Sequence, residues 1–223
     1  MKYLSITSPP PPPISKILTL TLPRSLTYAL RSFPSLTTSP LPDLSPVLGR
    51  LKSLTPSPGL ETGFRLLKAE GARVLIITNG SKGTTEEYVR QAGLRECVDG
   101  VQSCDEIGMG KPFGQVYEAA TQLCEQTSGR EGERWFVAAH MWDVCAARKA
   151  GCVVLFSSFL YTDSDVGPGP MDSFKTGAVL SEQPPLGNEE LDQWWELWGG
   201  KPDVIGMDLE EVARGIIASS TSR

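Results

Sequence analysis

The chain has 223 residues, which exceeds the ~150 residues of a typical domain, so one medium-sized domain with an added segment is expected. Its 21 basic and 26 acidic residues give a net charge of −5, which argues against nucleic acid or an anionic membrane surface as a partner. No apolar run approaches the ~20 residues that a bilayer-spanning helix needs, so we expect no membrane partner either.

The cysteines indicate a reducing compartment. They are Cys97, Cys104, Cys124, Cys145 and Cys152, an odd number without C-x-x-C spacing. Thiols of this kind pack as small apolar side chains, and a cytoplasmic location is expected. The run from Pro9 to Pro13 interrupts any signal-peptide hydrophobic region.

The N-terminal quarter is rich in proline and predicts little regular structure. Residues 1–13 predict a disordered, proline-rich arm, because their composition buries too little apolar area to offset the entropy of ordering. Residues 16–22 alternate apolar residues with threonine and predict a strand. Residues 25–33 predict a short helix and residues 47–54 a helical turn, whereas 34–46 hold too many prolines for either element.

From Gly59 onward, predicted strands alternate with predicted helices. The strands are 73–78, 98–103, 135–139, 152–157 and 203–206, and the helices are 60–70, 84–92, 113–126, 143–150, 188–198 and 208–218. Residues 161–187 are rich in glycine and proline and predict a loop. The alternation predicts a three-layer, Rossmann-like α/β fold with a central parallel sheet of about five or six strands.

Three clusters of polar residues are candidates for a site, because ligands of a doubly wound sheet bind beyond the carboxyl ends of its strands. The first is the turn Thr78-Asn79-Gly80-Ser81, whose hydroxyl, amide and backbone N–H groups suit an anion. The second is Gly110-Lys111-Pro112, followed by Tyr117 as a further substrate contact. The third runs from Ala138 to Asp143 and contains His140.

The amino-acid sequence in and around these clusters resembles the haloacid dehalogenase (HAD) superfamily, and within it the 2-haloacid dehalogenase branch. The matching segments are VLIITNGS (74–81), DGVQSCDEIGMGKPFGQVYEAA (99–120) and FVAAHMWDVCAARKAG (136–151). The resemblance covers roughly residues 59–157, and residues 201–213 resemble the family's last strand and helix. It implies a HAD-like domain over 14–223.

The resemblance also implies roles for individual residues. Thr78 stands at the position of the second-motif hydroxyl, and Asn79 follows where the family holds the substrate carboxylate or the leaving group. Lys111 corresponds to the lysine that neutralises the nucleophilic aspartate. Asp143 corresponds to the acid that orients this lysine or the attacking water, and His140 stands where dehalogenases often have asparagine.

The sequence departs from the family at the nucleophile. Family members attack with an aspartate at the end of the first strand, and aligning residues 16–26 with that strand places Thr21 there. A threonine hydroxyl with no adjacent base is no substitute for an ionised carboxylate, so we expect no aspartyl intermediate and only a substrate contact from Thr21. With Asp143 as the one evident anionic ligand, no magnesium site and no cofactor are expected. Residues 27–58 predict a truncated cap.

These residues favour a degenerate dehalogenase-like enzyme that acts on a small or medium organic anion. The anion would take the place of the missing carboxylate, and Lys111, Asp143 and His140 would transfer protons in an elimination, tautomerisation, decarboxylation or cyclisation. One alternative is a 2-haloacid dehalogenase-like hydrolase in which Asp143 or His140 activates water directly. The other is a non-catalytic HAD-like binding or scaffold protein.

Each of these residues also has a purely structural interpretation. Asp143 could cap a helix, His140 could pack, Lys111 could be a solvated loop residue, and Thr78 with Asn79 could form an ordinary turn. The predicted helix 188–198 carries Trp194, Trp195 and Trp198 at spacings that suit either packing on the sheet or a homodimer contact.

Overall fold

The computed structural model describes residues 13–32, 43, 45–50, 54–128, 133–150, 175–179, 188–197 and 200–221. The predicted arm therefore lies outside the described residues except for Pro13, and the predicted strand 152–157 lies outside them entirely. Within the described part of the chain, no helix combines the length and the apolar character needed to cross a membrane.

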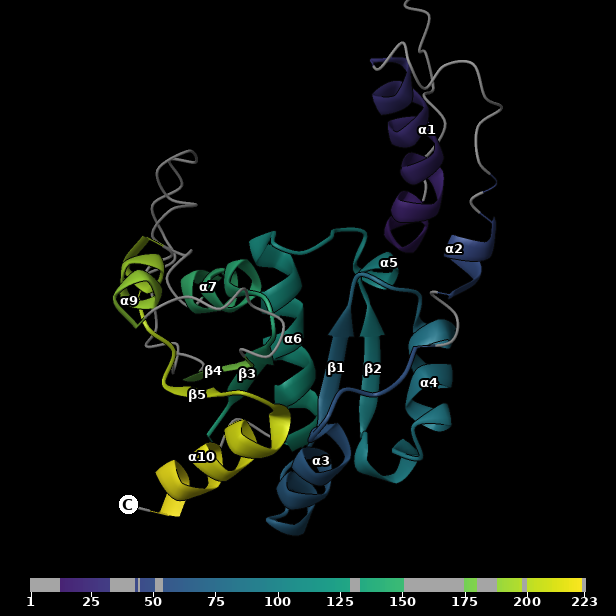
Figure 1. Ribbon diagram of the computed structural model, residues 1–223. Helices are drawn as coiled ribbons and strands as arrows, with labels where there is room; N and C mark the ends of the chain where they lie inside the picture. The colour runs from purple at the N-terminus through teal and green to yellow at the C-terminus, as the bar shows by residue number, and fades with distance from the viewer. Residues whose placement is uncertain are drawn as a thin grey trace, which may run out of the picture.

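The expected alternation of strands and helices is present from residue 60 onward (Figure 1). The strands are β1 (Leu75–Thr78), β2 (Gly100–Ser103), β3 (Trp135–Ala138), β4 (Lys175–Val179) and β5 (Val204–Gly206). The helices are α3 (Leu60–Ala69), α4 (Lys82–Gln91), α5 (Cys104–Ile107), α6 (Gly114–Ser128), α7 (Met141–Ala150), α9 (Asn188–Leu197) and α10 (Leu209–Thr221), with a 3₁₀ turn η3 (Arg95–Cys97).

Side-chain caps begin the helices that follow β1 and β2. The Ser81 hydroxyl accepts a hydrogen bond from the Thr84 N–H and starts α4. Ser103 and Glu106 form a capping box at α5, because the Ser103 N–H donates to the Glu106 carboxylate at 3.0 Å. Gly108 ends α5 at a φ of 77°, a conformation that favours glycine. At their carboxyl ends, β1 and β2 therefore turn sharply into α4 and α5.

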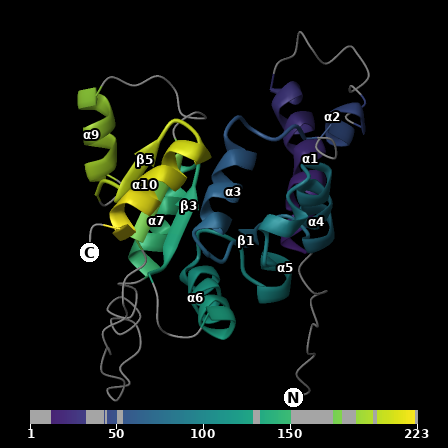
Figure 2. The same ribbon diagram turned by 90° about the horizontal axis from the view of Figure 1, so that it is seen from below.

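The strands lie between two helical layers (Figure 2). Helices α3 and α10 pack together on one side, and α6 and α7 pack together on the other. All strand pairs are parallel, which confirms the predicted three-layer fold. Among the described residues, the hydrogen-bonded strands fall into two groups, β1 with β2 and β3 with β4 and β5.

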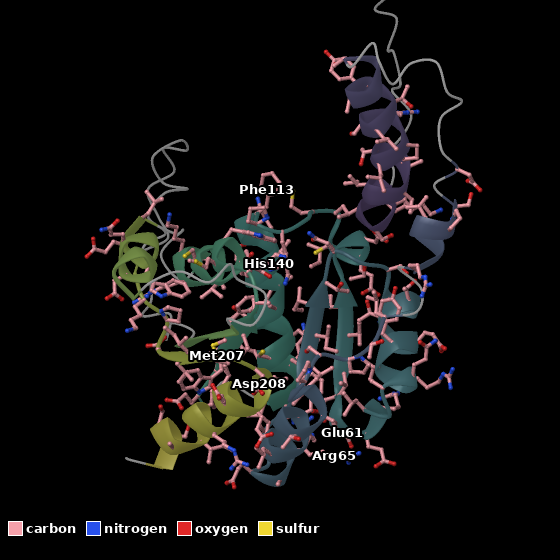
Figure 3. The ribbon with its side chains drawn as sticks, in the orientation of Figure 1. Glu61, Arg65, Phe113, His140, Met207 and Asp208 are labelled. Atoms are coloured by element: carbon pink, nitrogen blue, oxygen red, sulfur yellow. The ribbon has the colours of Figure 1, made fainter. Side chains whose placement is uncertain are left out.

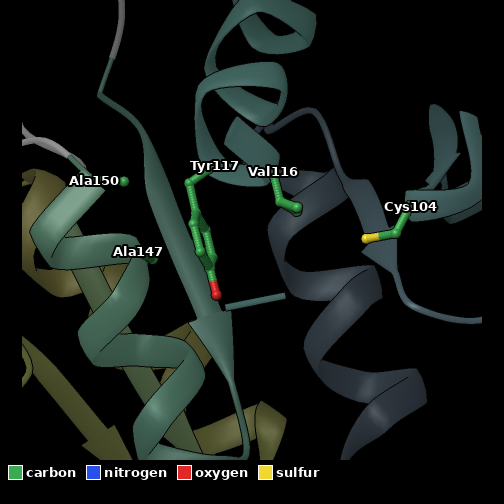
Figure 4. Close-up of a cluster of buried hydrophobic side chains, with 5 residues drawn as sticks. All are labelled: Cys104, Val116, Tyr117, Ala147 and Ala150. Atoms are coloured by element: carbon green, nitrogen blue, oxygen red, sulfur yellow. The ribbon is translucent and has the colours of Figure 1, made fainter. Parts of the chain in front are cut away.

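Helix α6 connects the two sheets through the apolar core. Its buried residues Val116 and Tyr117 pack with Cys104, and Ile77 of β1 and Phe136 of β3 pack against this cluster (Figure 4). Packing across both sheets brings the carboxyl ends of β1 and β3 to a common side of α6. The two strands thus deliver their following turns to the same end of the molecule.

The predicted strand at residues 16–22 was wrong. This segment lies in the 3₁₀ turn η1 (Ile14–Lys16) and the helix α1 (Ile17–Arg31), which stands beyond the carboxyl ends of β1 and β2 (Figure 1). The Thr21 hydroxyl donates to the Ile17 carbonyl at 2.7 Å, a bond that the helix satisfies locally. An isolated strand would need a paired neighbour for its backbone groups.

The remainder of the predicted cap, residues 27–58, is described only in part. It contains the end of α1 and the short helix α2 (Ser45–Arg50), which overlaps the predicted helical turn at 47–54. The predicted loop 161–187 was wrong at residues 175–179, because these form β4 and pair with both β3 and β5. The position of β4 depends on these neighbours rather than on its own short pattern.

Helix α9 is present where the tryptophan-bearing helix was predicted. Trp195 is buried and packs against Met141 and Val144 of α7, so this tryptophan is a core residue. Trp198 and the side chain of Trp194 lie outside the described residues. The homodimer contact expected through this helix stays a prediction.

Candidate functional site

Asp143 is the centre of a buried polar trio at the start of α7. The Lys111 ammonium donates to Asp143 Oδ2 at 2.7 Å, and the Tyr117 hydroxyl donates to Asp143 Oδ1 at 2.5 Å. The side chains of Lys111 and Asp143 are only 12% and 9% exposed. Both carboxylate oxygens are therefore engaged, and Asp143 ties α6, α7 and the Lys111 loop together.

The Phe136 ring lies beside the Lys111 ammonium, and the Tyr117 ring packs on Phe136. The Lys111 Nζ atom lies 5.2 Å from the centre of the Phe136 ring, a cation–π distance. Tyr117 packs edge-on against Phe136 with ring centres 5.4 Å apart. Burial and the hydrogen bond to Asp143 both raise the pKa of the Tyr117 phenol, so it remains a protonated donor.

Asn79 connects the end of β1 to this trio. Its side-chain Oδ1 accepts a hydrogen bond from the Lys111 backbone N–H at 2.9 Å. The side-chain NH₂ group of Asn79 then remains as a donor, and no acceptor for it lies among the described residues. Thr78 acts locally instead, because its hydroxyl accepts from the Gly80 N–H at 2.9 Å and shapes the turn.

Two other predicted site residues are exposed. The His140 carbonyl accepts from the Asp143 N–H at 3.0 Å, and its ring packs edge-on against Trp142 at 5.8 Å between centres, near α7 in Figure 3. Thr21 is exposed on α1, so its predicted place at the end of a first strand was wrong. The structure thus brings together Asn79, Lys111, Tyr117 and Asp143, whereas Thr21 lies on a helix, and the catalytic role expected of His140 stays a prediction.

Sequence reasoning missed three contributors to this region. Phe136 was assigned only to a strand, and the strand pattern gave no signal that its ring faces Lys111. Ile14 packs against the core cluster beneath the trio, and Ser15 beside it binds Asp105. No local pattern identified Ile14 or Ser15, because their contacts join residues about ninety positions apart.

The donor set of the trio does not suit a divalent cation. Magnesium needs several hard oxygen ligands, whereas both oxygens of Asp143 already accept hydrogen bonds and an ammonium group stands beside them. Among the described residues, no three His, Cys, Asp or Glu side chains gather in a possible metal cluster. The expected absence of a metal stays a prediction.

Comparison with known proteins identifies the family. A model of the haloacid dehalogenase-like hydrolases matches residues 36–151, a stretch that contains Asn79, Lys111, Tyr117 and Asp143. The chain belongs to this family. The resemblance to the HAD superfamily is thereby confirmed, and curated relatives are similar to this chain at the level of the 2-haloacid dehalogenase branch.

Curated relatives are bacterial dehalogenases. The chain is 34% identical over 99 residues to an (S)-2-haloacid dehalogenase of Pseudomonas sp. strain YL, covering 44% of this chain and 41% of the relative. It is 31% identical over 127 residues to (S)-2-haloacid dehalogenase 1 of Pseudomonas sp. strain CBS-3, covering 57% of this chain and 54% of the relative. The chain thus spans about half the length of the curated relatives that it matches.

Solved structures share the fold over a larger part of the chain. The L-2-haloacid dehalogenase from Xanthobacter autotrophicus superposes with a TM-score of 0.56 at 20% identity, covering 87% of this chain and 73% of that structure. The HAD-like α/β fold predicted from the sequence is therefore confirmed.

Proposed function

We propose that this protein binds the carboxylate of a small 2-haloacid-like substrate beside Lys111 and Asn79 and promotes its hydrolysis. The observation that supports the proposal is the set of donors left over at these two residues. Lys111 has three N–H donors and gives one to Asp143, and the Asn79 NH₂ group has no acceptor among the described residues. A carboxylate supplies two acceptor oxygens for such donors.

The electrostatics of the trio favour an anion of this kind. Asp143 balances the charge of Lys111, but the hydrogen bond from Tyr117 draws part of the Asp143 charge away from the ammonium. Low exposure strengthens the remaining attraction between Lys111 and a ligand anion. The solved relative from Xanthobacter autotrophicus was crystallised with chloropropionic acid covalently bound, a small haloacid of the proposed class.

Hydrolysis is favoured over the elimination or isomerisation expected from the sequence. The family and the relatives carry the names of hydrolases and dehalogenases. Both oxygens of Asp143 accept hydrogen bonds from protein donors, Lys111 and Tyr117, so the contacts present hold this carboxylate against the ammonium. We therefore assign Asp143 as a positioning residue that orients Lys111 rather than as a base or a nucleophile.

Water is the proposed nucleophile. Its oxygen bonds to C2 of the acid as the carbon–halogen bond breaks, the halide leaves with the electron pair, and the water proton passes to solvent. This route uses Lys111 and Asn79 to hold the carboxylate, and it needs no aspartyl ester. The missing aspartyl nucleophile remains part of the proposal.

Calorimetric titration with (S)-2-chloropropionate, paired with halide detection, tests the proposal. Binding and halide release are expected for the wild type, and Lys111→Ala should abolish both. Lys68→Ala removes another lysine–aspartate pair and is the matched control, with binding unchanged. Binding without halide release would contradict the hydrolytic step, and no binding would contradict the site.

A single turnover in ¹⁸O-labelled water distinguishes direct attack from a carboxylate ester. With enzyme in excess, direct attack puts ¹⁸O in the hydroxyacid during the first turnover. An ester intermediate would instead carry an enzyme oxygen into that first product. Unlabelled product would therefore overturn the water route.

The role of His140 is tested separately. Because its ring is exposed and packs on Trp142, we expect His140→Ala to retain turnover within about threefold, whereas an acid–base catalyst typically contributes about 10²–10⁴-fold. A loss in that larger range would restore the proton-transfer role.

A further inference from the structure

The turn η1 places an isoleucine beside the proposed carboxylate donors. A Cβ atom added to Gly110 would lie 3.3 Å from Ile14 Cγ2 and 3.6 Å from Asn79 Oδ1. The Ile14 side chain and the Asn79 carboxamide therefore converge on the same side of Gly110. The next residue, Lys111, donates its backbone N–H to Asn79, so Ile14 lies beside the Asn79 carboxamide and the start of the Lys111 loop.

Ile14 is fixed in this position by two kinds of contact. Its side chain packs against the apolar cluster that contains Cys104 and Tyr117. The following residue, Ser15, donates its N–H to Asp105 Oδ1 at 2.9 Å and its hydroxyl to Asp105 Oδ2 at 2.5 Å. These hydrogen bonds lower the pKa of the Asp105 carboxyl and pin η1 to α5.

We propose that Ile14 is a specificity-determining residue that limits the length of the apolar chain carried by the bound acid. The inference rests on the proposed carboxylate site and adds to it the surface that faces the rest of the ligand. In this proposal, the carbon chain of a carboxylate held by Asn79 and Lys111 lies against the Ile14 side chain, which itself packs on Gly110. The Ile14 methyl groups then provide apolar contact for a short chain and obstruct a longer one.

An exposed aromatic residue also gives this region an apolar character. Phe113, which follows the Lys111 loop, is 58% exposed and lies just above α6 in Figure 3. An aliphatic substituent fits these surroundings better than a second charged or strongly polar group.

Binding of straight-chain carboxylates tests the proposal without requiring turnover. Acetate, propionate, butyrate and hexanoate are titrated into wild type, Ile14→Ala and the matched control Ile17→Ala. In Ile14→Ala, the affinity for hexanoate relative to acetate should rise about tenfold or more, because each newly buried methylene contributes about threefold to fourfold. Ile17→Ala should keep the wild-type length profile.

Three further variants keep the test decisive if Ile14→Ala fails to fold. Ile14→Val removes one methyl group and should shift the profile in the same direction by a smaller factor. Gly110→Ala should shift it the opposite way, because its new Cβ presses on Ile14. Ser15→Ala releases η1 from Asp105 and should weaken the length discrimination.

The outcomes separate this inference from the function on which it rests. An unchanged length profile in both Ile14 variants, with acetate still bound, overturns the role of Ile14 and leaves the carboxylate site standing. Failure of every carboxylate to bind the wild type overturns both. A profile that shifts equally in Ile17→Ala would assign the effect to α1 as a whole and would also contradict the role of Ile14.

Discussion

Two lysine–aspartate pairs stand at opposite ends of the strands and differ in what surrounds them. At the amino ends of β1 and β2, Lys68 donates to both oxygens of Asp99 at 2.9 and 3.0 Å, and the Val74 N–H donates to the same carboxylate. These side chains are 28% and 25% exposed. At the carboxyl ends, Lys111 and Asp143 are less exposed, and a phenol occupies the second oxygen.

We propose that this difference in burial distinguishes a structural pair from a functional one. Water can satisfy the remaining donors of Lys68, so the Asp99 pair serves mainly to hold the starts of β1 and β2 in register. Lys111 is less exposed to water, and the proposed ligand carboxylate would accept its remaining N–H donors. A lysine and an aspartate therefore hold two strands together at the amino ends of the strands and form a candidate anion site at the carboxyl ends.

Among these variants, Lys111→Ala should lower the free energy of unfolding most. It leaves the Asp143 carboxylate buried with Tyr117 as its one side-chain donor, and loss of one partner of a buried pair costs about 3–5 kcal/mol. Urea denaturation measures this loss. Lys68→Ala at the more exposed pair should cost about 1 kcal/mol, and equal losses at the two ends would contradict the contrast.

Tyr117→Phe should lower the free energy of unfolding by about 1.5–3 kcal/mol, because Asp143 Oδ1 loses a hydrogen bond to a charged acceptor. The pKa of Tyr117 is raised in the folded state, so its contribution is present below the unfolded value of about 10 and is lost as pH rises above it. Stability measured from pH 8 to 11 should therefore fall more steeply for wild type than for Tyr117→Phe. Parallel curves would refute this linkage.

Asp99→Asn should cost about 1–2 kcal/mol, since the amide oxygen can still accept from Val74 but the ion pair with Lys68 is lost. Burial tends to raise the pKa of Asp99, but the hydrogen bonds from Lys68 and Val74 outweigh it and leave the pKa lowered. The stabilisation is therefore present above about pH 4 and is lost as pH falls below it. Acid titration of unfolding should show a shallower decline in the variant, and carboxylate binding at neutral pH should not change.

Of these variants, Glu87→Gln should change stability least, and it serves as the reference for an exposed ion pair. Hydrogen bonds from Arg90 and Gln91 lower the pKa of Glu87 to about 2, yet its side chain on α4 is 43% exposed. Solvent screening removes most of the benefit of such a pair. The melting temperature should not change measurably, and a clear decrease would show that exposed pairs also contribute.

Local sequence patterns were sufficient to predict secondary structure wherever a segment contained its own hydrophobic periodicity and its own helix cap. The helix predicted at 84–92 is present as α4 (Lys82–Gln91), which begins two residues earlier, directly after its Ser81 cap. Asn79, Lys111 and Asp143 were expected together because each follows or flanks a strand end, and the observed contacts join them. Tyr117 was expected as a substrate contact, whereas the fold buries it beneath Asp143 to about 1% exposure.

The sequence by itself determined the alternation of strands and helices from residue 60 to residue 150 and the strand ends that carry the polar residues. Only the tertiary structure decided that residues 17–22 form a helix, that 175–179 form a strand, and that His140 faces solvent while Ile14 lies beside Asn79. The reason is the range of the forces involved. Periodicity and capping act over a few residues, whereas strand pairing and burial depend on partners that the chain brings together only when it folds.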